Sequence, residues 1–172
     1  LQHCATVENY ETRKPPKMTP EARASRCAEL MFAKDAASAG LGMEISAVGP
    51  GSATLTMTVR PDMLNGHGIC HGGFIFALAD SAFAFACNSY NQLTVAQQNQ
   101  ITYLSPGQAG EQLIAEASET SRSGRSGIYY VTVTDAHGRK VALSRGPSRR
   151  IKGTHFPHDP RRDKTRHTDT PA

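Results

Sequence analysis

Apolar residues concentrate in one stretch near the middle of the chain, residues 72–88, GGFIFALADSAFAFACN. Of the fourteen residues from Phe74 to Cys87, only Asp80 and Ser81 are polar. A run of this length is typical of a helix, and a helix that is apolar on every side requires cover on every side. The run is too short to span a bilayer, and Asp80 interrupts it. We therefore expect a buried helix from about residue 72 to residue 88.

A second helix is predicted near the N-terminus, over residues 19–40, TPEARASRCAELMFAKDAASAG. Thr19 is suited to cap its first turn, and Pro20 fits the position directly after the cap. Gly40 is typical of the residue at which a helix ends. These signals predict one helix between Thr19 and Gly40.

Alternation of apolar and polar residues, the pattern of half-buried strands, recurs on both sides of the central helix. The predicted strands cover residues 41–51, 52–61, 93–105, 111–122, 128–135 and 140–151. Segment 111–122, EQLIAEASETSR, contains several helix formers, but its place between two turns favours a strand.

The order of these elements predicts the fold class. No helix alternates with each strand, so a parallel sheet is not expected. We expect an α+β fold in which an antiparallel β-sheet wraps around the central α-helix. One small sheet covers only part of such a helix, and this indicates a second subunit.

Charge divides the chain into regions. Residues 1–143 carry 11 Lys and Arg against 12 Asp and Glu, whereas residues 144–172 carry 8 Lys and Arg against 3 Asp. The end of the chain is thus basic, and it has too few apolar residues to order itself. We expect a flexible leader (1–19), a folded domain (20–152) and a disordered basic tail (153–172). Without aromatic interleaving, the tail is interpreted as solvated, and no nucleic acid is expected as a partner.

The N-terminal residues and the cysteines bear on location. The first 20 residues contain neither the basic region nor the apolar block of a secretory signal. The four cysteines, Cys4, Cys27, Cys70 and Cys87, show no paired spacing. We interpret them as reduced thiols of a cytoplasmic protein that does not associate with membranes.

Asp80 is the first candidate for chemistry. Its helix neighbours at three and four residues' distance are Phe76, Ala77, Phe83 and Ala84, and none can neutralise a carboxylate. Asp is rarely buried without a partner. It therefore either faces a solvated groove or polar group, or is a functional carboxylate; the apolar surroundings favour the second interpretation.

Gly72 and Gly73, at the predicted start of the helix, are the second candidate. Free N–H groups point outward there, the helix dipole favours negative charge, and a ligand oxygen can approach a backbone without side chains. These are the properties of an oxyanion hole, although a tight turn also explains two glycines. Eight residues separate Gly72 from Asp80, about 12 Å along a helix axis. If the two act on one carbonyl, Asp80 must come from an antiparallel helix of a second chain.

The segment MLNGHGICHGGFIFALADSAFAFACNS, residues 63–89, resembles the central segment of the hotdog-fold acyl-CoA thioesterases. The resemblance is to the branch found in phenylacetate degradation, with its Asn-Gly-His, His-Gly-Gly and Leu-Ala-Asp elements. YLSPG, SGRSGIYYVTV and VALSRGPSRRI resemble later strands of that branch, and the likeness covers roughly residues 25–152. The leader and the tail have no counterpart, and Ser144 and Pro147 depart from the pattern in the last strand.

The resemblance implies a homodimer with shared active sites, often paired into a homotetramer, that hydrolyses acyl-CoA thioesters such as phenylacetyl-CoA. The N–H of Gly72, with Gly73 close by, would polarise the thioester carbonyl, and Asp80 of the partner chain would act as base or nucleophile. Asn65 and His71 would position water or substrate, assisted by the Ser81 hydroxyl. Substrate contacts are expected from Gly73, Leu64, Phe74, Phe76 and Tyr103, although the apolar side chains among them also suit a core. Arg122 and Arg125 either meet the phosphates of coenzyme A or are solvated at the surface. No metal or organic cofactor is implied, because coenzyme A is part of the substrate.

Other interpretations of the same residues are weaker. His67, Cys70 and His71 resemble part of a metal site, but no second ligand cluster accompanies them. HGICH has His67 where the c-type haem motif requires Cys, and SRSGRSG lacks the ending of a phosphate loop. On the same fold, hydration of an enoyl-CoA and non-catalytic binding of acyl-CoA remain alternative functions.

Overall fold

The computed structural model describes residues 18–157; the predicted leader as far as residue 17, Cys4, and the tail from residue 158 lie outside them. The helices are α1 (Pro20–Phe32), α2 (Ala36–Gly40) and α3 (Gly72–Asn88), with a 3-10 turn, η1, at Pro61–Met63. The strands are β1 (Glu44–Gly49), β2 (Ser52–Thr58), β3 (Thr94–Ala96), β4 (Gln100–Tyr103), β5 (Gln112–Ser123), β6 (Ser126–Asp135) and β7 (Lys140–Arg150).

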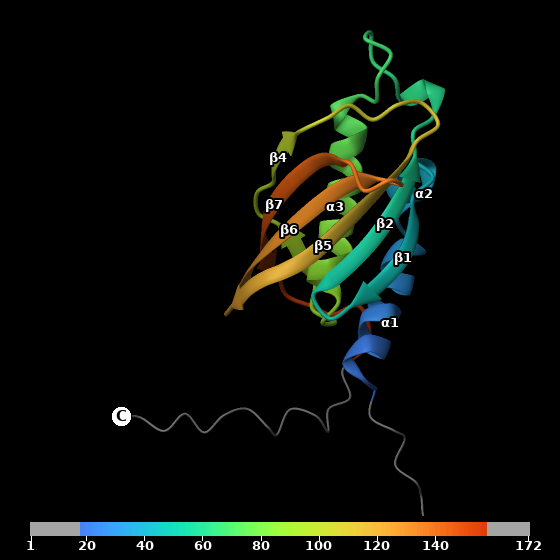
Figure 1. Cartoon of the computed structure of the whole chain (residues 1–172). Coiled ribbons are helices and arrows are strands. Elements are labelled where there is room, and N and C mark those ends of the chain that lie inside the picture. Colours follow the sequence, from blue (N-terminus) through green and yellow to red (C-terminus); the bar gives the residue numbers. More distant parts are fainter. Residues whose placement is uncertain (1–17, 158–172) are drawn as a thin grey trace, which may run out of the picture.

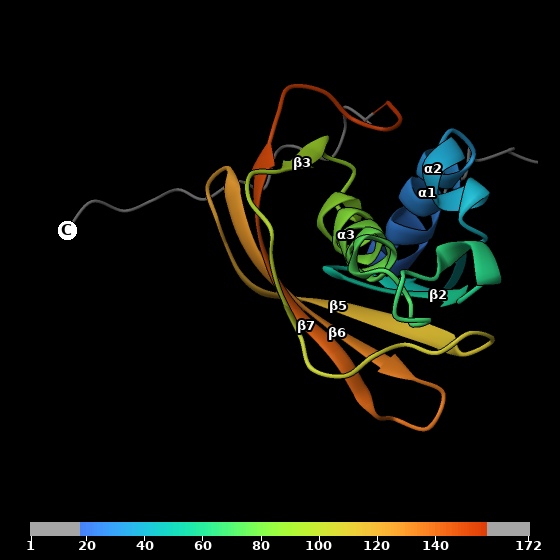
Figure 2. The same cartoon turned by 90° about the horizontal axis from the view of Figure 1, so that it is seen from above.

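All seven strands join one antiparallel sheet in the order β1-β2-β5-β6-β7-β3, and β4 also pairs with β7. The sheet curls around α3, and α1 and α2 lie beside the helix near β1 and β2 (Figure 2). This is the α+β arrangement that the sequence predicts. None of the helices in the described part of the chain is long and apolar enough to cross a membrane.

The core lies between α3 and the concave face of the sheet. Leu78, Ala82 and Phe83 are almost completely buried on α3, and the ring of Phe83 meets that of Tyr129 edge-on at 5.5 Å. The sheet contributes alternate residues such as Leu55 and Val131, as expected for strands with one buried face. This packing fixes the position of α3, and with it the position of every polar group that α3 carries.

The N-terminal segment forms two helices where the sequence predicts one. Thr19 caps α1 as expected, accepting a hydrogen bond from the N–H of Ala22 at 3.1 Å. The helix stops at Phe32 because Asp35 starts a new one: its carboxylate accepts from the N–H of Ser38 at 2.9 Å. An Asp inside a helical pattern can therefore cap a new helix and mark the point where one helix ends and the next begins.

The predicted strand 93–105 is also divided. Ala96 of β3 pairs with Ser148 and Gln100 of β4 pairs with Arg145, so residues 97–99 face only two residues of β7. The extra residue has the character of a β-bulge, which bends a strand and redirects a side chain. The other predicted strands are found, including β5, and β7 stays paired through Pro147 to Arg149.

The first residues of the predicted tail are ordered against the domain. The side chain of Asn91 donates to the carbonyl of Phe156 at 3.0 Å and accepts from the N–H groups of His155 and Phe156 at 3.0 and 3.1 Å. His155 also contacts Asn88 at 2.8 Å. Residues 153–157 thus lie against the end of α3, because two buried asparagines supply the hydrogen bonds that apolar residues do not.

We predict that Asn91→Ala lowers the free energy of unfolding more than Asn91→Gly. Asn91 has a φ of +58°, and both variants lose its three hydrogen bonds. Glycine adopts this backbone conformation without strain, whereas alanine adds about 1 kcal/mol to the loss. Urea unfolding measures both values, and trypsin should cut sooner after Lys152. Identical urea midpoints for the two variants would contradict the role of the backbone strain.

Candidate active site

The loop before α3 is held in place by the backbone. Leu64 pairs with Cys70 in a short bridge, and the N–H of Cys70 donates to the carbonyl of Gly107 at 2.9 Å. Between them, the side chain of Asn65 accepts from the N–H of His67 at 2.9 Å. The loop projects beside the first turn of α3 (Figure 1). Asn65 is therefore fixed next to the start of the helix by a turn of its own making.

The first turn of α3 leaves one backbone donor unused. His71 is the N-cap: its Nδ1 accepts from the N–H of Gly73 at 3.0 Å, and its carbonyl accepts from the N–H of Phe74 at 2.9 Å. Within residues 18–157, the N–H of Gly72 has no hydrogen-bond partner. This N–H lies at the positive end of the helix dipole, where an oxyanion is stabilised.

Tyr103 of β4 lies against the same turn. Its hydroxyl donates to the carbonyl of Gly72 at 2.9 Å, and burial raises the pKa of that hydroxyl. A Cβ at position 72 would lie 3.0 Å from the Tyr103 ring, so only glycine fits without displacing the ring. Half-buried Leu64 and Phe74 complete an apolar border, with Phe74 edge-on to His71.

Asp80 lies two turns further along α3 and is half-buried. Its Oδ1 accepts a hydrogen bond from Nδ2 of Asn99, in the bulge between β3 and β4. Burial raises the pKa of Asp80, and the hydrogen bond from Asn99 opposes that rise. A carboxyl group with a raised pKa is better suited to take up a proton than an ordinary surface carboxylate.

The hydroxyl of Ser81 is directed toward α2. The hydroxyl of Ser81 lies 2.9 Å from that of Ser38, which in turn donates to Asp35 at 2.6 Å. Ser81 therefore joins α3 to α2 within this chain. Phe76 is half-buried on α3, one turn before Asp80.

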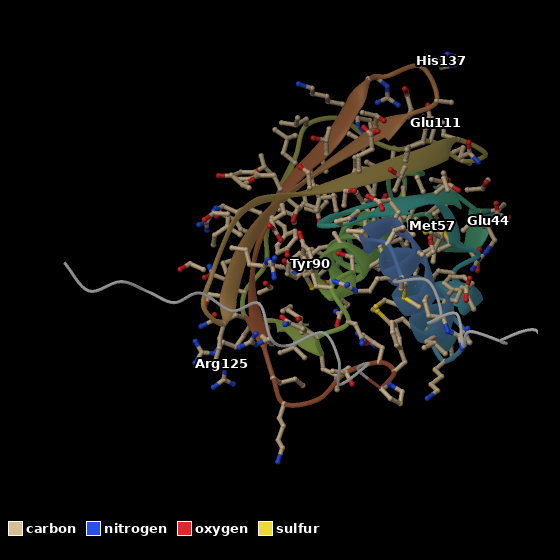
Figure 3. All side chains as sticks on the ribbon, turned by 90° about the horizontal axis from the view of Figure 1, so that it is seen from below. Glu44, Met57, Tyr90, Glu111, Arg125 and His137 are labelled. Atoms are coloured by element: carbon tan, nitrogen blue, oxygen red, sulfur yellow. The ribbon has the colours of Figure 1, made fainter. Side chains whose placement is uncertain are left out.

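Arg122 and Arg125 lie at the other end of α3. Together with Arg150, they line a small pocket near Tyr90. The Arg122 guanidinium stacks on the Tyr90 ring at 3.7 Å, and Arg125 donates twice to the carbonyl of Arg150. Figure 3 shows Arg125 at the opposite end of the sheet from Glu111 and His137.

The structure thus brings one group of predicted site residues together. These are Leu64, Asn65, His71, Gly72, Gly73, Phe74 and Tyr103, all at the start of α3. Asp80, Ser81 and the two arginines lie elsewhere on the same chain. Asn99 is the residue that sequence reasoning missed. Its signal is the polar run QQNQ, residues 97–100, inside a segment interpreted as a half-buried strand.

Neither a nucleophilic role for Cys70 nor the metal site considered for His67, Cys70 and His71 is supported by the geometry of the described residues. Burial raises the pKa of the Cys70 thiol, whose Sγ contacts the carbonyl of His71 at 3.7 Å. Such a thiol is a weak nucleophile at neutral pH. In the described residues no three His, Cys, Asp or Glu side chains gather as metal ligands would.

Comparisons with known proteins agree with this arrangement. The family model of the thioesterase superfamily matches residues 67–142. The acyl-coenzyme A thioesterase PaaI of Escherichia coli K12 is 44% identical over 127 residues, which are 74% of this chain and 91% of that protein. The structure of E. coli PaaI, from the phenylacetic acid degradation operon, superposes with a TM-score of 0.78 at 42% identity, over 79% of this chain and 99% of that one.

A second similar structure contains a ligand. A Streptococcus mutans protein bound to acetyl-CoA has a TM-score of 0.63 at 25% identity, over 65% of this chain and 90% of that one. The curled sheet, the central helix and these matches define a hotdog-fold thioesterase. The chain belongs to the thioesterase superfamily, in the branch that contains PaaI. The predicted family, fold and enzyme class, a thioester hydrolase, are confirmed.

Proposed function

We propose that this protein hydrolyses acyl-CoA thioesters to the free acid and coenzyme A, acting on (hydroxy)phenylacetyl-CoA or a related aromatic acyl-CoA in phenylacetate catabolism. The observation that carries the proposal is the unpaired N–H of Gly72 at the start of α3, bordered by Phe74 and Tyr103. The relationship to a PaaI thioesterase supports the same substrate class.

The thioester carbonyl accepts a hydrogen bond from Gly72, and the negative charge of the tetrahedral intermediate develops toward that donor. The oxygen of water bonds to the carbonyl carbon while Asp80 takes a proton. The carbon–sulfur bond then breaks, and the coenzyme A thiolate leaves with that proton. In the alternative sequence, Asp80 attacks the carbonyl carbon itself, the carbon–sulfur bond breaks and the coenzyme A thiolate leaves. Water then hydrolyses the resulting anhydride to the free acid and regenerated Asp80, and the proton that it gives up goes to the thiolate.

His71 orients the donor. Because Nδ1 of His71 accepts from Gly73, the neutral ring carries its proton on Nε2. This bond occupies the donor of Gly73 and leaves that of Gly72 for the substrate. Asn65, anchored in the adjacent turn, supplies an amide for water or substrate, and Leu64, Phe74, Phe76 and Tyr103 contact the acyl group.

Asp80 reaches the carbonyl from a second chain. About 12 Å of helix separate it from Gly72 of its own chain. Small residues, Gly73, Ala77 and Ala84, flank Asp80 on the side of α3 that one chain leaves partly uncovered. They allow a second α3 to pack closely and antiparallel, so that each Asp80 approaches the partner's first turn. Ser81 supports this geometry by fixing α3 to α2.

The same pairing brings each basic pocket near the start of the partner helix. Arg122 and Arg125 then meet the phosphates of coenzyme A, which matches the positive charge of the pocket. Tyr130 and Leu143, exposed on the outer face of the sheet, are the surface on which two dimers form a tetramer. The free thiols of Cys27, Cys70 and Cys87 fit a cytoplasmic location. The reaction requires no metal ion or organic cofactor.

We predict that Asp80→Asn lowers kcat on phenylacetyl-CoA by about 10³-fold, because the group that takes the proton is lost. The fold should survive: since burial raises the pKa of Asp80, the ionised carboxylate opposes folding at neutral pH, and its removal does not destabilise the protein. Release of free thiol measures the activity.

Asp62→Asn is the matched control, because Asp62 is an exposed carboxylate outside α3 that is already paired with Arg60 at 3.0 Å. It should retain full activity. An equally active Asp80→Asn protein would refute the mechanism. Loss of enoyl-CoA absorbance without release of thiol would instead favour hydration of an enoyl-CoA. Tight binding of acyl-CoA without turnover would favour a non-catalytic acyl-CoA-binding protein.

We predict that two inactive variants complement each other. Gly72→Val blocks the oxyanion donor, and Asp80→Asn removes the carboxylate. A mixed dimer of one chain of each kind holds one intact site and should show about half of the wild-type activity. Differently tagged chains, co-expressed and purified by both tags, provide that dimer. Inactive mixed dimers, or a fully active monomer, would exclude the shared site.

We predict that Arg122→Met raises KM for phenylacetyl-CoA by about 10-fold with little change in kcat, because a charge-assisted contact to phosphate is lost. Phenylacetyl-pantetheine has neither the diphosphate nor the adenosine phosphate of coenzyme A. With this substrate, the variant and the wild type should have the same KM. Arg145→Met, on the outer face of β7, is the control and should change neither value. An equal rise in KM on both substrates would contradict phosphate binding.

A further inference from the structure

Asn99 is the protein partner of Asp80 among the described residues. Its Nδ2 donates to Oδ1 of Asp80, and Oδ2 of Asp80 has no hydrogen-bond partner within residues 18–157. An ionised carboxylate only accepts hydrogen bonds, so the amide must present its NH2 group to it. One carboxylate oxygen is therefore held, and the other is available to water or substrate.

The backbone around Asn99 directs this contact. The N–H of Gln97 donates to the carbonyl of Pro147 at 2.9 Å, and Gln100 pairs with Arg145. Between these two anchors the chain has one residue more than β7 opposite, and the resulting bulge turns Asn99 toward α3. Asn99 is consequently placed by the sheet, independently of the helix that carries Asp80.

Gly146 of β7 leaves the space that the amide occupies. A Cβ at position 146 would lie 2.6 Å from Oδ1 of Asn99 and 3.1 Å from the ring of Phe83. Because Phe83 is fully buried in the core, Asn99 is the side chain that would have to move. Gly146 thus leaves room for the amide beside Asp80.

We propose that Asn99 is the positioning residue of Asp80: it orients the carboxylate and favours the ionised form that accepts a proton from water. The inference rests on the proposed function, since it assigns Asn99 a part in the same reaction. It adds to the site a residue that belongs neither to α3 nor to the loop before it. It also explains why position 146, next to the Asn99 side chain, is a glycine.

A neutral amide is suited to this task. It stabilises the ionised carboxylate against burial, but less than an Arg or Lys partner would. Burial thus raises the pKa of Asp80, and the hydrogen bond from the amide partly opposes that rise. Loss of the amide leaves burial unopposed, and the pKa of Asp80 then rises.

The ionisable groups on the surrounding elements are engaged with other partners or are buried thiols. Tyr129 of β6 donates to Glu119 of β5 at 2.7 Å, Tyr103 of β4 donates to Gly72, and Asp35 before α2 accepts from Ser38. Burial raises the pKa of Cys27 on α1, and that of Cys87 on α3 to about 12. Asn99 is therefore the polar group to vary.

The test compares Asn99→Leu with the wild type across pH. We expect kcat/KM near neutral pH to fall by about 10-fold, KM to change little, and the acid limb of the pH profile to move up by about one pH unit. Part of the lost activity should return at high pH, where Asp80 is ionised again. Gly146→Ala, which displaces the amide from the opposite strand, should shift the profile in the same direction.

Gln98→Leu is the matched control: Gln98 is the exposed neighbour of Asn99 and should leave the profile unchanged. If Asn99→Leu fails to fold, Asn99→Asp keeps the size of the side chain and should raise the pKa of Asp80 further, because two carboxyl groups then share the slot. If the acid limb of the pH profile stays in place in these variants, even with a lower kcat, Asn99 has only a structural role and the proposal is wrong.

A second readout separates this inference from the proposed function. The titration of the Asp80 carboxyl carbon, followed by NMR and assigned with Asp80→Asn, requires no turnover. A wild type that releases no thiol from any acyl-CoA would refute the thioesterase, while an upward shift of this titration in Asn99→Leu would still support the pairing. An identical titration in both proteins would overturn it.

Discussion

The rest of the structure depends on one constraint: α3 is apolar around its whole circumference, and a single chain covers only part of it. The sheet curls to enclose one side and α1 and α2 lie against another. The side that contains Ala77, Asp80 and Ala84 is only half-buried. Burial of apolar surface is the main favourable term in folding, so this incomplete cover favours association of chains. The shared site that we propose would then be a consequence of how the helix is buried.

The polar groups of α3 are distributed in accordance with that constraint. At its first turn His71 accepts a hydrogen bond from the N–H of Gly73, while the N–H of Gly72 has no partner among residues 18–157. In its middle Ser81 is bonded toward α2, while Asp80 is bonded toward the sheet by Asn99. Two adjacent polar residues in an apolar helix thus have different partners on opposite sides. A carboxylate in this position retains both a fixed orientation and a raised pKa.

The sequence predicts the large features of this protein and misses those that depend on tertiary pairing. Apolar periodicity located α3, and alternation located the strands, because both patterns reflect burial directly. The break at Asp35 and the division of strand 93–105 were missed, since helix and strand propensity say little about where pairing is interrupted. Segment 153–157 was assigned to the tail because its composition is polar, whereas Asn88 and Asn91 order it through hydrogen bonds. The groups at the start of α3 follow from a motif; the partner of Asp80 does not, because it comes from a bulge nineteen residues later.

The contact between Gly146 and Asn99 restricts the order in which these positions can change during divergence. A side chain at position 146 is tolerated only after residue 99 has become smaller or has turned away, and either change alters the environment of Asp80. The change at position 99 must therefore precede the change at position 146. The effects of the two mutations are not independent, and the cause of this epistasis is steric. Divergence at positions 99 and 146 would be accompanied by a change in the pH range of activity, long before it became visible in the stability of the fold.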